Sequence, residues 1–187
     1  RQLREWQLHF PAMPPQFVSV NISGRHLGQS DLVECIKDIL EETELDPASL
    51  KLEIAEQSIA EKPDATAAVL GRLKALQVKL FIDVFGTGYS SLGRIHRLPI
   101  DGIKIDRSFI RSIEDHQENQ KIVKTMLTLA EDMNIDAIAE GVETQIQLER
   151  ISSLRCAYGQ GYYFSEPVRR DRAAALMGIP ATLSAAS

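Results

Sequence analysis

The sequence has only two cysteines, no excess of positive charge and no long apolar run, and each shortage excludes a class of protein. Cys35 and Cys156 lie far apart and match neither a zinc-binding spacing nor a disulfide framework, so we expect both to be buried as small hydrophobic residues. A reducing cytoplasm is the default compartment for such a chain. The net charge of -5 argues against binding to polymeric nucleic acid, which requires a basic face to displace counterions. An anionic ligand would therefore be held locally, through metal ions.

No apolar run approaches the roughly 20 residues that span a bilayer. The first residues include Arg1, Arg4 and Glu5 and are followed by three prolines, which does not resemble the apolar segment of a secretory signal. We therefore expect no membrane contact by this segment. The hydrophobic content of 44% over 187 residues is enough to bury a sizeable core.

Short β-branched runs alternate with longer stretches of helical periodicity, a pattern typical of parallel strands joined by crossover helices. The six predicted strands cover residues 17–22, 51–55, 78–83, 102–105, 136–139 and a short segment near 156–158. Each is followed by a helical segment. The sequence therefore predicts an α/β protein.

Six βα units predict a TIM-like (β/α) barrel with about six of its eight units in this chain, since such barrels usually run to about 250 residues. The opening segment RQLREWQLHF is expected to be a helix without a strand before it, so the missing units are expected on the N-terminal side. An open parallel sheet would leave unpaired edges, which favours a fragment, a swapped assembly or a chain cut within its domain. We expect one domain over residues 1–180 and a flexible tail over 181–187.

Three stretches have apolar residues at helical spacing, which predicts helices packed on the sheet. Asp31 is expected to cap the first helix and Pro63 to begin the second. The expected apolar faces are, in order, Leu32, Ile36, Ile39 and Leu40; Val69, Leu73 and Leu76; and Ile122, Met126, Leu129 and Met133. Core packing is a sufficient explanation for the last of these.

Five successive predicted strands end in polar side chains, at the place where α/β barrels carry their active sites. Carboxylates with an amide oxygen, and no histidine cluster, are typical of a site for Mg²⁺ or Mn²⁺ rather than zinc. Any one of these acids alone is more often a structural acid or a loop cap. The joint pattern favours a metal site. The residues are Asn21 with Ser23, Glu53 with Glu56, Asp83, Lys104 with Asp106, and Glu140 with Glu143.

The segment IDVFGTGYSS follows the third predicted strand and contains Gly86 and Gly88. These glycines would let the backbone approach a ligand or move as a lid. The segment fails the dinucleotide-binding pattern because Ser91 stands where a third glycine belongs, and no lysine follows as in a P-loop. Ser90 and Ser91 are equally suited to capping the next helix.

The segments VNIS, LEIAEQ, DVFGTGYSSL, PIDGIKID, AEGVE and GQGYYFSEP occur in this order over nearly the whole chain. Together they resemble the EAL family of cyclic di-GMP phosphodiesterases. The resemblance implies a bacterial signalling barrel that hydrolyses cyclic di-GMP to linear pGpG with two Mg²⁺ or Mn²⁺ ions. It also implies a homodimer in the cytoplasm, with regulatory domains outside this segment.

The resemblance further implies roles for the residues that match its motifs. The metal ligands would be Asn21, Glu53, Asp83 and Glu140, of which Glu140 would also be catalytic. Lys104 would orient the attacking water. Supporting or substrate-binding roles would fall to Glu56, which would brace the glycine loop, and to Gly86, Gly88, Asp106, Glu143 and Gln160. That loop would link the site to the dimer interface.

The chain departs from the family pattern at two places. The family has two consecutive aspartates before its Phe-Gly, and this sequence has Asp83 followed by Val84, which cannot ligate a metal. The glutamate of the EAL tripeptide would precede residue 1. The acidic ligands thus fall from five to three, and hydrolysis is expected to suffer before binding does. An alternative is that Val84 simply improves the packing of a buried strand.

Three functions remain open from the sequence. The first is a metal-dependent phosphodiesterase of reduced activity, and the second is a degenerate barrel that binds cyclic di-GMP without cleaving it and acts through a protein partner. The third is a dimerisation module without nucleotide affinity.

Near the last strand, Tyr162, Tyr163 and Phe164 are compatible with stacking on a base or with a place in the core.

Overall fold

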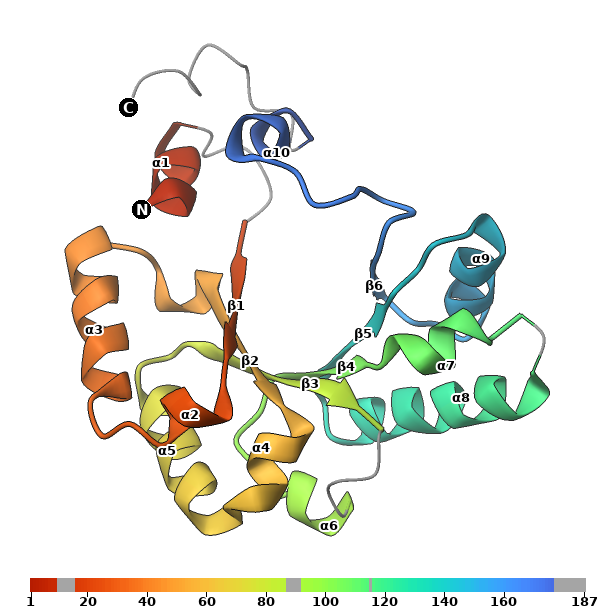
Figure 1. Cartoon of the computed structure of the whole chain (residues 1–187), viewed down its shortest axis with the longest axis horizontal. Coiled ribbons are helices and arrows are strands. Elements are labelled where there is room, and N and C mark those ends of the chain that lie inside the picture. The colour runs from red at the N-terminus through yellow and green to blue at the C-terminus, as the bar shows by residue number, and fades with distance from the viewer. Residues whose placement is uncertain (10–15, 87–91, 115, 177–187) are drawn as a thin grey trace.

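The computed structural model describes residues 1–9, 16–86, 92–114 and 116–176, and it shows one sheet of six parallel strands (Figure 1). The strands pair in chain order, from β1 to β6, and the sheet curls into a half-barrel. This confirms the predicted TIM-like α/β fold. The strands are β1 (Val18–Ile22), β2 (Leu50–Ala55), β3 (Lys79–Phe85), β4 (Gly102–Ile105), β5 (Asp136–Glu140) and β6 (Tyr158–Gln160).

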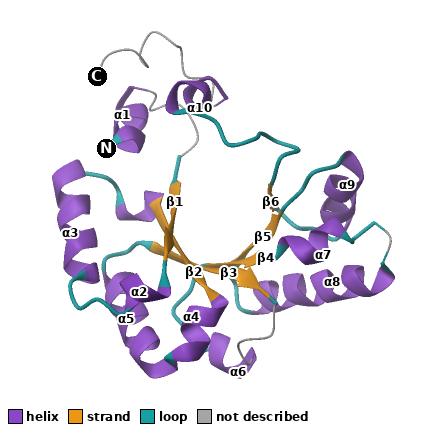
Figure 2. Ribbon diagram, in the orientation of Figure 1, coloured by secondary structure: helices purple, strands orange, loops and turns teal. Residues whose placement is uncertain are grey.

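Most of the helices connect strands and lie on the outer, convex side of the curled sheet, whereas the first and the last helix lie at its open side (Figure 2). None of the described helices is long and apolar enough to cross a membrane. The helical segments are α1 (Gln2–His9), α2 (Gly24–Leu27), α3 (Leu32–Thr43), the 3₁₀ helix η1 (Pro47–Ser49), α4 (Glu56–Glu61), α5 (Pro63–Ala75), α6 (Leu92–Ile95), α7 (Arg107–Arg111), α8 (Gln117–Asp132), α9 (Gln145–Ser153) and α10 (Arg170–Leu176).

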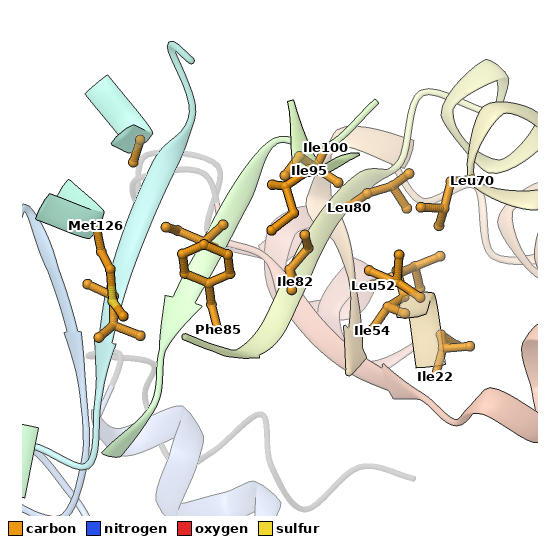
Figure 3. Packing of buried hydrophobic residues seen from close by; sticks show 14 of the residues in the cluster. Ile22, Leu52, Ile54, Leu70, Leu80, Ile82, Phe85, Ile95, Ile100 and Met126 are labelled. Carbon is orange, nitrogen blue, oxygen red and sulfur yellow. The ribbon is translucent and has the colours of Figure 1, made fainter. Parts of the chain in front are cut away.

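The core lies between the convex face of the sheet and these helices. Every second residue of the central strands is buried there, since side chains alternate between the two faces of a strand. The buried strand residues include Leu52, Ile54, Leu80, Ile82, Ile103 and Ile105, several of which are drawn in Figure 3. The concave face therefore receives the other residues, among them the polar ones at the strand ends.

Helix starts follow local chemistry only in part. Pro63 begins α5, as predicted. Thr144 caps α9 through a reciprocal capping box with Gln147, and Asp46 accepts a hydrogen bond from the backbone N–H of Ala48. Asp31 is the N-cap residue of α3, as predicted, although its side chain makes no capping hydrogen bond.

Two predicted apolar faces each include one residue that lies outside the core. Ile39 of α3 is 49% exposed and Ile122 of α8 is 39% exposed. The buried face of α3 carries Val33, Ile36 and Leu40, and that of α8 carries Val123, Met126, Leu127 and Ala130.

The cysteine prediction was also wrong. Cys35 is exposed and Cys156 is only partly buried. Cys35 precedes the buried Ile36 of α3 and so falls outside the packed face of that helix. Burial raises the pKa of the Cys156 thiol, so its environment does not activate it.

Candidate active site

The carboxyl ends of β1 to β6 carry polar side chains on the concave face. Parallel pairing sets Asn21 beside Glu53 and Glu140 beside Gln160. Lys104 lies on β4, between Asp83 of β3 and the end of β5. Residues far apart in the sequence are thereby brought to one end of the half-barrel.

Lys104 is the centre of a cluster of charged side chains. Its Nζ atom lies 2.6 Å from Oε2 of Glu53, 2.5 Å from Oε1 of Glu140 and 3.4 Å from Oδ1 of Asp83. Lys104 and Glu53 are buried, and the side chains of Asp83 and Glu140 are each 20% exposed. Three carboxylates surround one ammonium group, so two formal negative charges are in excess.

Burial and neighbouring charges act in opposite directions on this cluster. Burial by itself would lower the pKa of Lys104, but hydrogen bonds to Glu140 and Glu53 outweigh it and raise that pKa. Burial raises the pKa of Glu140; Lys104 opposes this effect, and the negative charges of Asp83 and Glu53 reinforce it. The cluster therefore stabilises added positive charge.

The donor set fits a divalent cation. Oδ1 of Asp83 is buried and accepts no hydrogen bond, although it lies 3.4 Å from the lysine ammonium. A buried anionic oxygen without a hydrogen bond is costly, and a cation would satisfy it. Carboxylate oxygens are the ligands that Mg²⁺ and Mn²⁺ prefer. Within the described part of the chain, however, no three His, Cys, Asp or Glu residues are already grouped around a common metal position.

A bulge in β3 explains why positions 83 and 84 both lie at this site. Ile82 pairs with Ile103 and Phe85 pairs with Ile105, so Asp83 and Val84 together stand opposite the single residue Lys104. Strand β3 consequently extends two residues beyond its predicted end.

Val84 does not have the backbone of a regular strand. Its φ of 57° lies in the left-handed region, which costs an L-residue roughly 1–2 kcal/mol and is rare for β-branched side chains. Val84 therefore lacks the extended backbone on which the strand-packing alternative rests. Aspartate tolerates the left-handed region better than valine does.

Glu56 is buried at the start of α4 and accepts a hydrogen bond of 3.0 Å from the backbone N–H of Gly86. Gly86 has a φ of 103°, and a Cβ atom there would lie 2.2 Å from Cε of Met126. Only glycine fits this position. Gly88, Ser90 and Ser91 lie outside the described residues, so the rest of the predicted glycine loop is not placed.

The remaining predicted residues lie outside the lysine cluster. Asp106 caps α7, accepting a hydrogen bond of 2.9 Å from the backbone N–H of Ser108, which is the structural role that a lone strand-end acid usually has. Glu143 is exposed at the start of α9. Asn21 and Gln160 are exposed on the outer strands of the described sheet.

A cavity of about 610 Å³ reaches from Glu53 to Gln160 across the concave face. Its wall includes Lys51, whose ammonium group lies 3.6 Å from the centre of the Phe17 ring, and Tyr158. The volume is in the range of small-molecule sites. The sequence interpretation missed Lys51 and Tyr158, although their spacing of two residues from Glu53 and Gln160 assigns them to the same face.

The aromatic residues after β6 are not part of the core. Tyr162 is 63% exposed, Tyr163 39% and Phe164 51%. Phe164 also lines the cavity and forms an edge-to-face pair with Tyr163. Their exposure beside the candidate site is compatible with stacking on a ligand ring.

Comparison with known proteins supports the resemblance. The sequence profile of the EAL domain matches residues 1–167. The cyclic di-GMP phosphodiesterase NbdA of Pseudomonas aeruginosa is 39% identical over 168 residues, which are 90% of this chain and 21% of that protein. The bifunctional diguanylate cyclase/cyclic di-GMP phosphodiesterase MucR of the same organism is 35% identical over 155 residues, which are 83% of this chain and 23% of that protein. The chain thus spans less than a quarter of the length of these relatives.

Solved structures agree with the fold. The MucR phosphodiesterase in complex with cyclic di-GMP superposes with a TM-score of 0.85 at 32% identity, over 92% of this chain and 70% of that one. The EAL domain of DcpA from Mycobacterium smegmatis gives a TM-score of 0.87 at 29% identity, over 95% and 79%. BlrP1 of Klebsiella pneumoniae, in a complex with manganese and cyclic di-GMP, gives 0.80 at 29% identity, over 89% and 43%.

Proposed function

The chain belongs to the EAL domain family, and on that basis we propose that it binds cyclic di-GMP on its concave face and hydrolyses it slowly to pGpG. The observation that carries this proposal is the convergence of Glu53, Asp83 and Glu140 on Lys104, together with the unsatisfied buried oxygen of Asp83. This arrangement has an excess of negative charge that a divalent cation would neutralise. In a purely structural cluster we would expect the positive and negative charges to balance.

In this proposal the residues of the chain have distinct tasks. Asn21, Glu53, Asp83 and Glu140 would hold Mg²⁺ or Mn²⁺, which supplies positive charge to activate water and to stabilise phosphate oxygens. Lys104 is an ammonium group whose charge its neighbours stabilise, so it donates hydrogen bonds to the water or to a phosphate oxygen. It does not serve as the base.

Val84 is the reason to expect slow hydrolysis. The family pattern has a carboxylate at this position of the bulge, and valine contributes no ligand. Loss of one ligand weakens a two-metal site more than it weakens binding of the nucleotide, which also contacts the wall of the cavity. The same observation favours a second candidate function, a receptor that binds cyclic di-GMP without cleaving it and signals to a protein partner.

Further features of the family extend the proposal. Gln160 and Glu143 would support the site from the ends of β6 and β5, and Gly86 with Gly88 would form the adjoining loop. We also propose that the chain acts in the bacterial cytoplasm as a homodimer, under the control of regulatory domains outside this segment.

One experiment separates the candidate functions. The protein is incubated with cyclic di-GMP and Mn²⁺, and nucleotide binding and pGpG release are measured in parallel. Lys104→Met should abolish release, whereas Lys121→Met, an exposed lysine on α8, is the matched control and should change neither signal. Binding without release would favour the receptor, and absence of both would leave a structural module.

A further inference from the structure

Lys51 is a cation on the concave face to which the proposed function assigns no task. It lies on β2, two residues before Glu53, and both residues line the cavity of about 610 Å³. Side chains two residues apart on a strand point to the same face and are separated by about 6–7 Å along it. The cavity extends from Ser19 of β1 to Tyr158 of β6, the strands at the two edges of the curled sheet (Figure 1). Lys51 therefore lies one step toward the amino end from the candidate metal ligands.

The ammonium group of Lys51 lacks the carboxylate partner that the other lysines of the described sheet have. Lys104 on β4 contacts three carboxylates. Lys79, which pairs with Lys51 across β2 and β3, lies 3.0 Å from Oδ1 of Asp101. Lys51 has neither an ion pair nor a hydrogen-bond acceptor among the residues that the structure describes. Its three N–H donors therefore remain available to a ligand.

Two aromatic rings flank this ammonium group. Its Nζ atom lies 3.6 Å from the centre of the Phe17 ring and 4.7 Å from the centre of the Phe81 ring. Such rings attract a cation, but they replace only part of the hydrogen bonds that water would give it. Lys51 is half-buried, so it has lost part of its hydration. An anionic acceptor on a ligand would supply what the rings do not.

The charges around the cavity favour an anionic group at Lys51. Among the described residues of the cavity wall, Lys51 is the only cation and Glu53 is the only carboxylate. Glu53 is already engaged by Lys104 at 2.6 Å. Asp136 and Glu53 attract the charge of Lys51 from beyond ion-pair distance, so neither takes the place of a bound anion.

Cyclic di-GMP presents two phosphates, which lie on opposite sides of its macrocyclic ring. When one phosphate lies at the metal ligands, the other lies across the ring from it. A cation one step along the strand from Glu53 is placed to receive this second phosphate. Because that phosphate undergoes no bond change, such a contact stabilises the bound substrate and the transition state equally.

We propose that Lys51 binds a phosphate group within the cavity, and that in cyclic di-GMP this is the phosphate that is not cleaved. The assignment to cyclic di-GMP rests on the proposed function, whereas the affinity of Lys51 for phosphate does not.

The first test measures binding of cyclic di-GMP in the presence of Mn²⁺ and, in parallel, pGpG release at saturating nucleotide. Lys51→Met should weaken binding about tenfold, equivalent to about 1.4 kcal/mol. Release at saturation should change by less than about twofold, because the lost contact is uniform. Lys51→Arg keeps the charge and should retain most of the affinity. Stabilisation of the protein by Mn²⁺ alone should be the same in all these variants.

Lys79→Met is the matched control. Lys79 lies beside Lys51 in the sheet, but it is paired with Asp101 and does not line this cavity. This variant should bind cyclic di-GMP as the unmodified chain does. Unchanged binding in Lys51→Met, or an equal loss in Lys79→Met, overturns the proposal.

The second test removes the phosphate from the ligand instead of the lysine from the protein. The linear dinucleotide GpG has one internal phosphate and lacks the second. Lys51→Met should therefore weaken binding of GpG by less than about twofold, against about tenfold for cyclic di-GMP. An equal loss for both ligands would show that Lys51 does not recognise the second phosphate.

The third test uses inorganic phosphate and separates the two proposals. Phosphate is titrated at constant ionic strength in EDTA, and the side-chain NMR signals of the lysines are followed. The signals of Lys51 should shift with saturation, and those of Lys79 should not. Failure of the unmodified chain to bind cyclic di-GMP contradicts the proposed function, whereas absence of the shift at Lys51 contradicts the phosphate subsite.

Discussion

The two ends of the half-barrel carry charged clusters of opposite design. At the carboxyl end, three carboxylates surround Lys104. At the amino end, Asp101 accepts hydrogen bonds from the side chains of Lys74 and Lys79 and from the backbone N–H of Leu80. In the cluster around Asp101, which we call the lower cluster, both oxygens of the single carboxylate accept hydrogen bonds. The cluster around Lys104, which we call the upper cluster, has excess negative charge, and its buried Asp83 Oδ1 accepts no hydrogen bond.

This difference distinguishes a structural cluster from a functional one. Asp101 joins α5 and β3 to the loop before β4, and its contacts complete one another without a ligand. Under the proposed function, the cluster around Lys104 becomes complete only with an additional cation. In α/β barrels, residues at the amino end of the strands commonly serve stability, and the active site lies at the carboxyl end.

The largest expected effect is that of Lys104→Met on the upper cluster. The substitution leaves three carboxylates together without their buried counter-charge, and breaking a buried ion pair costs on the order of 3–5 kcal/mol. Urea unfolding in EDTA should show this loss, with Lys121→Met as control. Addition of Mn²⁺ should restore part of the stability, and failure of both effects would contradict the assignment of the cluster.

Asp101→Asn should destabilise the protein by about 1–2 kcal/mol, because it weakens the hydrogen bonds from three donor groups, two of which are lysines that are partly exposed and screened by solvent. The same urea unfolding measures the change. Unlike Lys104→Met, this variant should bind cyclic di-GMP as the unmodified chain does. A loss of binding would show that the two ends are not independent.

The pH dependence of the Asp101 contribution has a defined sign. Burial would raise the pKa of Asp101, but the hydrogen bonds from Lys74, Leu80 and Lys79 outweigh burial and lower it. The stability it adds is therefore fully present above its unfolded pKa of about 3.9 and is lost as the pH falls through the lower folded pKa. The difference between the unmodified chain and Asp101→Asn should be constant from about pH 7 to 5 and shrink below about pH 4.

Val84→Asp adds the carboxylate that the upper cluster lacks relative to its family. Release of pGpG should rise about tenfold or more, equivalent to about 1.4 kcal/mol in the activation barrier. Val84→Asn is the matched control, since it relieves the same backbone strain without the charge. An equal gain in both variants would assign the effect to the backbone rather than to the missing ligand.

The smallest expected effect is that of Asp83→Asn on the ligand-free protein. Removing a carboxylate from a cluster with excess negative charge should change the unfolding free energy by less than about 1 kcal/mol, in contrast to Asp101→Asn. Stabilisation by Mn²⁺, measured as the shift of the unfolding midpoint, should be reduced at the same time. A large loss of stability in EDTA would give the upper cluster the same structural role as the lower one.

Local pattern was a reliable guide where one residue type has one consequence. Alternating β-branched runs predicted the six strands, and Pro63 marked a helix start. Local pattern was not sufficient where the position of a residue depends on contacts with residues distant in sequence. The apolar stripe of α8 begins at Val123 rather than Ile122 because the packing of the helix on the sheet sets its rotation. The capping bond that Asp106 makes at the start of α7 is a further contact that local context did not reveal.

The sequence by itself determined the family, the order of the strands and the set of acids at their ends, because these depend on residue type and spacing. Only the tertiary structure decided that Lys104 lies among three carboxylates and that Asp83 and Val84 share one place opposite it. The physical reason is that strand register and bulges are fixed by hydrogen bonds between distant segments. A one-residue change in that pairing exchanges the two faces of a strand, and the local sequence pattern does not specify the pairing.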